Sequence, residues 1–358
     1  ILANNTFDKG SMLWAGTTQC PAGQPRRWDS GAFLNVAGIY SAIQQYGVNK
    51  AVSGDLLHVF PGVYVEQVTV NKTMTLLGSG PAVTFIQAPA TIPVASDPNS
   101  GIVKITGANV SVEMSQFTVS GRGPSGCGSI GYGIAVRDAA YANIHDNHIV
   151  DVRDTGDSGC QNGNAIVVGR NAWSTTGTAD ITDNVISTYQ KTGILVDNTG
   201  SSANITGNTI SGGGPTATIA ENGIQISRGA TAEIDDNTVS GHAYTGASAS
   251  SSGLLLWTAG TVNSDGNTIT ENEAGIWATD TSGTHQNNTI TATRSGTQLS
   301  AEVSLHAPKG YRLLDLANPS NRPVRVQNNA VTVVGKDAGG AAIGAPRTGT
   351  TSAAGVVT

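Results

Sequence analysis

A short pattern, an Asn followed two residues later by an Ile or Val, recurs along the chain and constrains its fold more than any other feature. A second pattern, a Gly or Ala followed directly by an aliphatic residue, precedes most of these Asn residues. Because the two patterns alternate in step, the chain consists of repeats of one supersecondary unit. The Asn is found at Asn147, Asn184, Asn208, Asn237, Asn267, Asn288 and Asn329, and the small residue at Gly133, Ala165, Gly193, Gly223, Gly253 and Gly275.

The two halves of the repeat differ in how constant their length is. From the small residue to the next Asn the distances are 14, 19, 15, 14, 14 and 13 residues, and the longest contains an insertion around Trp173. From the Asn to the next small residue they range from 8 to 18. Apolar residues alternate after the small residue, as in Ile194 and Val196, which is the period-two pattern of a strand with one buried face.

These repeats predict a β solenoid, in which stacked coils pair strand to strand at about 4.8 Å and share one core. Asn tolerates the left-handed backbone of a tight corner, and its amide can bond the Asn of the coils above and below. We therefore predict that the six Asn residues from Asn147 to Asn288 stack at one corner. A meander of hairpins with Asn-Thr turns is the alternative, but hairpins would not keep one half of the repeat constant.

The region before the coils carries a resemblance to a known superfamily. Residues 41–48 have the pattern of a short amphipathic helix, and PGVYVEQVTVNKTMTLLGSG follows before the Asn repeats begin. Over residues 36–298 the chain resembles the right-handed parallel β-helix superfamily with the pectin-lyase-like fold and short β-helix repeats. The resemblance implies an all-β right-handed parallel β-helix, a solenoid closed by a short N-terminal capping helix.

The resemblance, together with the spacing and composition of the two ends, suggests the organisation of the whole chain. Residues 1–35 would be an N-terminal segment, such as the end of a preceding module, and 36–298 the parallel β-helix with its capping helix at 41–48. Residues 299–340 break the coil spacing and would cover the C-terminal end, where an open β edge invites association. Residues 341–358 are small and polar, which is typical of a linker-like tail.

Composition excludes several classes of function. Asp, Glu, Lys and Arg make up only 12% of the chain, and the net charge is -6 with scattered basic residues, so we expect no nucleic-acid partner. No apolar run reaches the roughly 18 residues of a membrane helix, and we expect no membrane span. The superfamily commonly acts outside the cell on polysaccharides, which predicts an extracellular or cell-surface location for a secreted protein.

Insertions at one corner of a solenoid stack on one face, so the variable segments 120–132, 151–164, 211–222 and 240–252 should form a shared surface, here called the loop wall. Ionisable and aromatic residues gather in it although the chain is poor in charge. The catalytic candidates are Asp154, Lys191 and Asp157, and the substrate-binding candidates are Arg122, Asp151, Arg153, Tyr189, His242 and Tyr244.

Two kinds of chemistry fit the loop wall. Glycoside hydrolysis needs two carboxylates, about 5 to 5.5 Å apart for retention or 6.5 to 9.5 Å for inversion. Lyase or epimerase chemistry needs a cation for a uronate carboxylate and a base for the C5 proton, which Arg153 with Lys191 or Tyr244 would supply. A calcium site in the Asp cluster and an ordinary solvated Asp-Gly turn are further alternatives. No other cofactor is expected.

One ion pair and one disulfide follow from stacking. Asp154 and Lys191 occupy the same place in consecutive coils, so their backbones should lie about 5 Å apart and their charged groups should pair. Cys127 lies seven residues before Ile134, and Cys160 six before Ile166, so these cysteines also match. We predict that they are bonded, which an extracellular location favours, leaving Cys20 over.

A second surface is predicted on the outward side of the strand that follows each small residue. A sheet that is apolar on both sides is normally covered on both. The cover would be another part of the chain, such as the insertion with Trp173, or other copies or modules contacting the face near Leu195, Leu255 and Trp277. The outward positions are Ala135, Val167, Leu195, Gln225, Leu255 and Trp277.

Two functions remain open at this point. The first is an extracellular polysaccharide-binding or polysaccharide-processing β-helix module with its site on the stacked loops. The second is a non-catalytic structural or adhesive module of a large surface protein or filament. The Asp triplets of polygalacturonases, the mannuronan epimerase signature and the calcium-binding GGxGxD nonapeptide are missing. The sequence therefore assigns no reaction; an enzyme of this kind would be a polysaccharide lyase, glycoside hydrolase or uronate epimerase.

Overall fold

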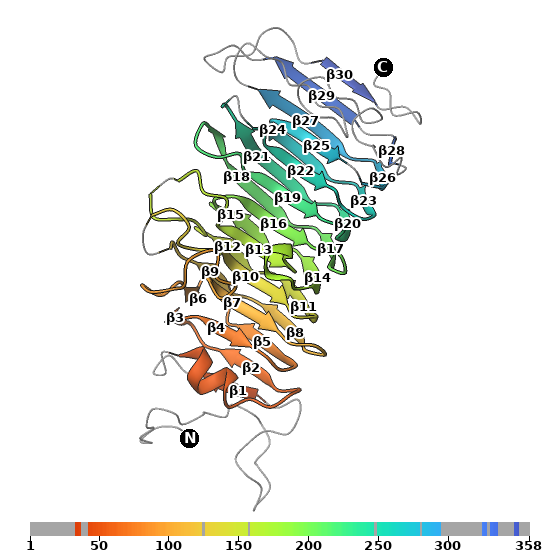
Figure 1. Cartoon of the computed structure of the whole chain (residues 1–358). Helices are drawn as coiled ribbons and strands as arrows, with labels where there is room; N and C mark the ends of the chain where they lie inside the picture. Colours follow the sequence, from red (N-terminus) through yellow and green to blue (C-terminus); the bar gives the residue numbers. More distant parts are fainter. Residues whose placement is uncertain are drawn as a thin grey trace, which may run out of the picture.

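The chain winds into a right-handed parallel β-helix whose coils each place one strand in each of three parallel sheets (Figure 1). The fold predicted from the repeats is confirmed. This computed structural model describes residues 33–36, 42–123, 126–156, 158–246, 249–279, 281–294, 324–327, 330–335 and 347–350. Asp157 and Cys20, both named above, lie outside the described residues.

Sheet A holds the strand that precedes the corner formed by the ladder Asn residues. Its neighbours pair in parallel and in register, for example Ile144 with Ile181 and Ile205. Its strands are β1 (Phe33–Val36), β2 (Leu56–Val59), β5 (Met74–Gly78), β8 (Ser111–Ser115), β11 (Ala140–His145), β14 (Gly177–Thr182), β17 (Ser202–Thr206), β20 (Thr231–Asp235), β23 (Val262–Asp265), β26 (Gly283–Gln286) and β28 (Val324–Gln327).

Sheet B follows the Asn corner with short strands, and the loop wall leads from it to the next sheet. Its strands are β3 (Gly62–Val65), β6 (Thr84–Gln87), β9 (Thr118–Ser120), β12 (His148–Val150), β15 (Val185–Ser187), β18 (Thr209–Thr216), β21 (Thr238–Tyr244), β24 (Thr268–Asn272), β27 (Thr289–Arg294), β29 (Ala330–Gly335) and β30 (Arg347–Thr350), of which β30 pairs antiparallel with β29.

Sheet C contains the strands in which the small residue of each repeat is the second residue. Its inward residues form an aligned column that is fully buried, including Ile134, Ile166 and Ile194. Burial of such columns from all three sheets makes one continuous core. Its strands are β4 (Val68–Val70), β7 (Gly101–Thr106), β10 (Tyr132–Arg137), β13 (Asn164–Val168), β16 (Thr192–Asp197), β19 (Asn222–Ser227), β22 (Ser252–Trp257) and β25 (Ala274–Thr279).

The predicted Asn ladder is present at the corner between sheets A and B. From Asn147 to Asn267, each amide nitrogen donates to Oδ1 of the next Asn, at 3.2 Å for Asn147 to Asn184 and 2.8 Å for Asn267 to Asn288. Each Oδ1 also accepts from the main-chain nitrogen at the same place one coil earlier, which belongs to Phe117 for Asn147 and to an Asn for the others, as Asn208 accepts from Asn184 at 3.0 Å. All six side chains are fully buried, so the ladder satisfies polar groups that water cannot reach.

The left-handed backbone of this corner lies one residue earlier than we predicted. Asp146, Asp183 and Asp236 have φ of 53°, 54° and 56°, and Gly207 and Gly266 take the same place in their coils. The prediction that the ladder Asn itself is left-handed is therefore wrong. The physical reason is that the residue before the Asn makes the turn of the chain, which leaves the Asn side chain pointing inward, where it stacks on the Asn of the next coil.

The N-terminal end of the core is closed by a helical turn over Gln44–Val48 (η1), within the predicted range 41–48. Ile43 and Val48 are fully buried in the core. The Glu66 carboxylate accepts from the main-chain nitrogens of Ile43 and Gln44 at 2.5 and 2.9 Å, which fixes the start of the turn.

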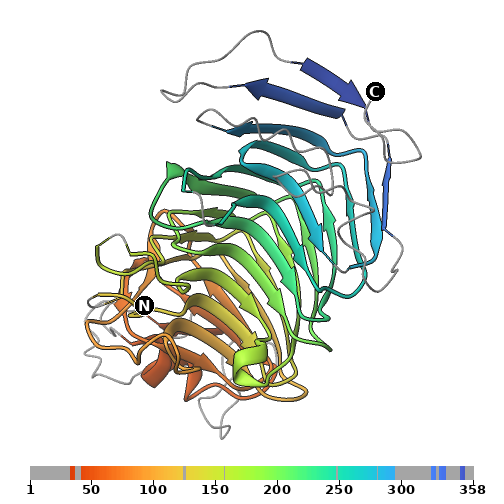
Figure 2. The same cartoon turned by 45° about the horizontal axis from the view of Figure 1, so that its top comes forward.

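Strand pairing extends beyond the predicted limits of the β-helix, 36 and 298. At the N-terminal end, β1 begins at Phe33 and pairs with β2. At the C-terminal end, β28 and β29 continue sheets A and B inside the segment predicted as a cover, and β30 lies inside the predicted tail. Figure 2 shows these last strands continuing the stack of coils.

Candidate functional site

The loop wall is braced by a disulfide between the loops that lead into β10 and β13. Cys127 and Cys160 are bonded, with Cα atoms 5.6 Å apart, inside the usual range of about 4.4 to 6.8 Å. This is the pairing that the matching positions of the two cysteines predict. The bond ties two consecutive coils together at the corner that accepts insertions.

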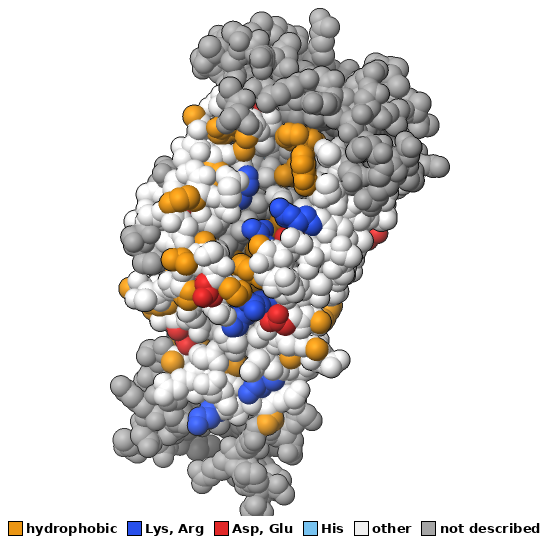
Figure 3. All heavy atoms as spheres, viewed as in Figure 1, with side chains coloured by type: hydrophobic (Ala, Val, Ile, Leu, Met, Phe, Trp, Pro, Cys, Tyr) orange, Lys and Arg blue, Asp and Glu red, His pale blue; other side chains and the backbone are white. Residues whose placement is uncertain are grey.

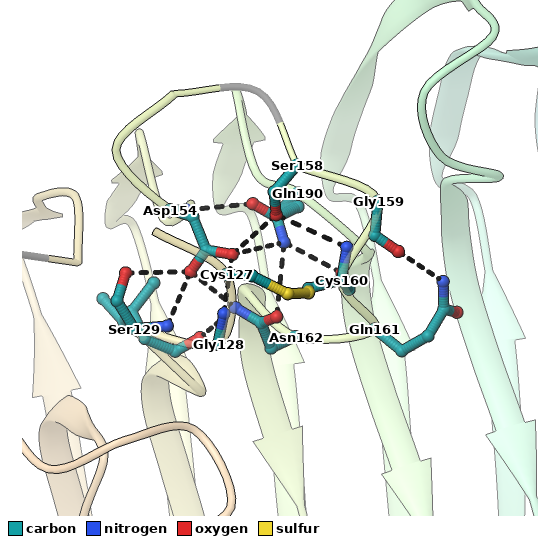
Figure 4. The surroundings of a disulfide bond; sticks show 11 residues. Cys127, Gly128, Ser129, Asp154, Ser158, Gly159, Cys160, Gln161, Asn162 and Gln190 are labelled. Atoms are coloured by element: carbon teal, nitrogen blue, oxygen red, sulfur yellow. Dashed lines mark hydrogen bonds between the residues drawn. A yellow bond between two sulfur atoms is a disulfide. The ribbon is translucent and has the colours of Figure 1, made fainter. Parts of the chain in front are cut away.

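Asp154 lies directly beside this disulfide, at the centre of a hydrogen-bond network (Figure 4). Its side chain is only 1% exposed. The donors to its carboxylate, at 2.7 to 3.1 Å, are the main-chain nitrogens of Gly128 and Ser129, the hydroxyls of Ser129 and Ser158, and the amides of Asn162 and Gln190. Burial acts to raise the pKa of Asp154, but the donors outweigh burial and lower this pKa to about 2.

This environment makes Asp154 a structural anion rather than the catalytic candidate that we predicted. A carboxylate accepts about four hydrogen bonds at its lone pairs, and the six donors around Asp154 occupy them. No oxygen is left for a substrate or for calcium. Among the residues that the structure describes, no group of three or more His, Cys, Asp or Glu side chains could hold a metal ion.

The prediction of an ion pair between Asp154 and Lys191, both of which the structure describes, is wrong. Asp154 turns toward Gly128 and Ser129 of the preceding coil, whereas Lys191 donates from Nζ to the carbonyl of Ala220 in the following coil at 2.5 Å. The two side chains therefore point in opposite directions along the stack.

Lys191 remains an unusual amine. It is half-buried, and burial lowers its pKa to about 8, although the nearby carboxylate of Glu221 acts to raise this pKa. A substantial fraction of this amine is therefore neutral at a weakly alkaline pH.

Three of the predicted binding residues form an exposed ion-pair cluster on the loop wall. Nε of Arg122 lies 3.0 Å from one oxygen of Asp151, and Nε of Arg153 lies 2.7 Å from the other. Asp151 has a φ of 59°, so the chain turns sharply there. The cluster is solvated, and such surface pairs contribute only about 0 to 1 kcal/mol.

Tyr189 and His242 are not on the surface, which corrects their assignment as substrate-binding residues. Tyr189 is 3% exposed and His242 is fully buried, because both turn inward at the corner between sheets B and C. Their rings are stacked with centroids 6.0 Å apart, and the Tyr189 hydroxyl donates to Nε2 of His242. Tyr244 is half-buried at the end of β21, where its main-chain nitrogen donates to Glu273 at 3.3 Å.

The outward side of sheet C offers a second surface, and its first half is covered from within the chain. Ala135, Val167 and Leu195 align across β10, β13 and β16, and together with Tyr132 they form a small cluster against which Trp173 packs. Trp173 belongs to a short 3-10 helix, Asn171–Trp173 (η2), in the insertion noted in the sequence. Leu195 is therefore covered by another part of this chain, which is the first of the two predicted kinds of cover.

Two arginine side chains flank Trp173, the residue that covers this part of sheet C. The guanidinium carbons of Arg137 and Arg170 each lie 5.9 Å from the centre of the Trp173 ring, within reach of a cation–π interaction. Beyond Trp173, Asp197 is fully buried and pairs with Arg228 at 2.8 Å. Burial lowers the pKa of Arg170, Asp197 acts to raise it, and Arg228 acts to lower it.

The second half of the face carries one exposed and one half-buried tryptophan. Trp257 is 44% exposed and meets Trp277 edge to face, with ring centroids 6.5 Å apart. Leu255 and Gln225 lie beside them in the aligned column that also contains Trp277. Figure 3 views this side of the molecule and shows Lys and Arg side chains gathered over the middle of sheet C, with a hydrophobic patch over β22 and β25.

Sequence reasoning missed Arg137, Asp197 and Trp257, although a signal for them existed. Each lies two residues beyond an outward position that we did identify, namely Ala135, Leu195 and Leu255. Because side chains of a strand alternate with period two, the outward column continues to these residues. Extending the alternation by one step finds them.

Comparison with known proteins agrees with the geometry. The family model described as a right-handed β-helix region matches residues 94–290, which is more than half of the chain. The chain belongs to the right-handed β-helix family. No curated protein matches this β-helix chain.

Among solved structures, this β-helix chain is similar to one described as "Crystal structure of pectin methylesterase in complex with hexasaccharide VII". The identity is 11%, the match covers 83% of this chain and 85% of that chain, and the TM-score is 0.31. The β-helix fold thus rests on the family match and the sheet topology. Within the described residues, no helix has the length and apolar character needed to cross a membrane.

Proposed function

We propose that this chain is an extracellular module that binds an acidic polysaccharide on the outward side of β16, β19, β22 and β25, here called the binding face. The observation that carries the proposal is a tryptophan pair, the exposed Trp257 and the half-buried Trp277, on the same face as a half-exposed Arg228. The face is formed by Asp197, Gln225, Arg228, Leu255, Trp257 and Trp277.

The chemistry of these side chains suits a sugar chain. Aromatic rings supply large rigid apolar surfaces on which the apolar side of a sugar ring can pack. The amide of Gln225 can exchange hydrogen bonds with hydroxyls, and guanidinium groups recognise carboxylates or sulfates. Arg170, in the insertion beside the binding face, interacts electrostatically with Asp197 and Arg228, so two cations and one anion meet at this edge of the face in a chain whose net charge is -6.

The proposed activity is binding, because the described face does not present the groups of a glycoside hydrolase. Asp197 is buried and held by Arg228 and by the hydroxyl of Ser227, both at 2.8 Å. A hydrolase needs two available carboxylates on either side of the scissile bond. The disulfide between Cys127 and Cys160 supports the extracellular assignment, since such bonds persist in oxidising compartments.

A glycan array followed by titration calorimetry of the whole chain tests the proposal. Polygalacturonate, alginate and a sulfated polysaccharide are compared with a neutral glucan. We expect binding to at least one acidic polymer, and a loss of about tenfold or more in affinity for Trp257→Ala and for Arg228→Ala. Val185→Ala is the matched control, because Val185 is 39% exposed on sheet B, away from the binding face.

Two results would overturn the proposal. The first is no binding to any polysaccharide on the array, which is what a purely structural module predicts. The second is binding that neither Trp257→Ala nor Arg228→Ala weakens, which would move the site elsewhere on the surface.

A further inference from the structure

The geometry points to recognition of the end of a polysaccharide chain, with Trp173 as the residue that stops the chain. This inference rests on the proposed function and adds to it a binding mode and a residue that determines specificity. It follows from the contrast between the two halves of the outward side of sheet C.

The stop is an insertion found in one coil. Residues 169–176 connect β13 to β14, whereas residues 198–201 make the same connection from β16 to β17 in the next coil. The additional residues fold back over sheet C and place Trp173 on Leu195 and its aligned neighbours, as described above. A sugar chain lying along the stack of coils meets this indole where β16 gives way to β13.

Trp173 is held firmly. Its ring meets Tyr132 edge to face at 5.6 Å between centroids, and Arg137 and Arg170 flank it. The base of the insertion is closed by main-chain bonds of 2.9 and 3.2 Å between Arg170 and Thr175. The main-chain nitrogen of Asn171 donates to Asp197 at 2.9 Å, which ties the insertion to β16.

The face on the far side of Trp173 is engaged by other parts of the chain. The carbonyl of Pro98 accepts from the hydroxyl of Tyr132 at 3.0 Å and from Arg137 at 2.6 Å. Lys104 donates to the side chain of Asn99 at 2.7 Å. The cations of β7 and β10 are therefore bonded to the segment around Pro98 and do not continue the binding face.

The binding face differs from one end to the other in the way that recognition of the end of a polysaccharide requires. The end of this face that lies away from Trp173 is aromatic, with Trp277 and Trp257. The end next to Trp173 is cationic, because the side chain of Arg228 there is 50% exposed. The body of an acidic sugar chain would lie on the tryptophans, and the charge of its last sugar would meet Arg228. An internal segment cannot be bound in this way because Trp173 blocks its continuation.

The number of protein molecules bound to each polymer chain tests this inference. One acidic polysaccharide that binds the full-length protein is prepared in several fractions, each of a narrow range of polymer lengths. Calorimetry then gives the number of protein molecules bound per polymer chain for each fraction. End recognition predicts one protein per polymer chain at every length, with affinity per mole of chains unchanged. Internal binding predicts a stoichiometry that rises in proportion to length.

The variant Trp173→Ala removes the stop and should convert the first pattern into the second. Replacement of residues 171–174 by two glycines is a second route to the same opening, and circular dichroism verifies that each variant is folded. Val185→Ala should keep one protein per chain.

A stoichiometry that rises with length in the unaltered protein would overturn the inference and leave the proposed function intact. So would one protein per chain in both opened variants, since the stop would then lie elsewhere. Absence of binding to every length fraction and every acidic polymer contradicts the proposed function itself.

Discussion

Tyr189 donates a hydrogen bond to Nε2 of His242 across an intervening coil, 53 residues away in the sequence. The opposite ring nitrogen, Nδ1, donates to the side-chain oxygen of Asn272 at 2.7 Å, so the hydrogen-bond partners assign a neutral His242. Gly212 leaves the room for this column, because a Cβ there would lie 2.7 Å from Cδ2 of His242. A second polar column thus runs inside the core.

Two buried histidines, His242 of this column and His285 of β26, predict that the protein loses stability in mild acid. Burial lowers the pKa of His242 from 6.5 to about 4, and burial lowers the pKa of His285 to about 4 as well. Between pH 6.5 and 4 the unfolded chain binds more protons than the folded chain, so the free energy of unfolding falls as pH falls. The loss approaches about 3 kcal/mol for each histidine at pH 4.

Urea unfolding at pH 7.5, 6.5, 5.5 and 4.5 measures this loss. His242→Gln should remove its share of the pH dependence, whereas Val185→Ala, at an exposed position on sheet B with no titratable group, should leave it unchanged. Stability that stays flat from pH 7.5 to 4.5 would show that these histidines are not buried in neutral form. Asp154 does not interfere in this range, because its pKa of about 2 confines its effect to lower pH.

Asn208→Ala should destabilise the β-helix by about 3 to 5 kcal/mol. The Asn208 amide donates to Ile181, Thr206 and Asn237 at 2.8 to 3.1 Å, and its loss leaves buried acceptors without a donor. Thermal unfolding followed by circular dichroism measures the change. Asn204→Ala, an exposed position on the neighbouring strand, should cost far less, and equal losses for both variants would refute the special role of the ladder.

Asp154→Asn should lower the melting temperature and leave polysaccharide binding intact when measured well below that temperature. The amide cannot accept all the donors that the carboxylate now accepts, and we expect a loss of about 2 to 4 kcal/mol. Asp151→Asn in the same loop is the control and should cost about 1 kcal/mol or less, because its ion pairs are solvated. Abolished binding at unchanged stability would restore Asp154 as a functional residue.

Removing the disulfide should destabilise the fold by about 3 to 4 kcal/mol, as expected for a sequence separation of 33 residues in the chain-entropy treatment. The double variant Cys127→Ser with Cys160→Ser is compared with the unaltered protein by urea unfolding. Thiol titration of the denatured, unreduced protein should find one free thiol among the three cysteines. Three free thiols would contradict the bond.

The sequence alone determined the features that repeat with every coil. Asn147, Asn184 and their successors recur because each must occupy the same corner and bond the next, so spacing was enough to predict the ladder and the solenoid. Cys127 and Cys160 were predictable for the same reason, since their nearly equal distances of seven and six residues from the aligned Ile134 and Ile166 place them side by side in consecutive coils.

Only the tertiary structure decided which way the side chains of the loops point. The loops vary in length, so no period links a position such as Asp154, Tyr189 or His242 to a face, and counting from the ladder Asn predicted one surface for all of them. In the structure, the Asp154 side chain points toward a ring of hydrogen-bond donors, and the His242 side chain points into the core. Trp173 also lies across sheet C in the structure. Exposure of the apolar outward side of these strands to water is unfavourable, and which segment covers it depends on which segment can reach it in three dimensions.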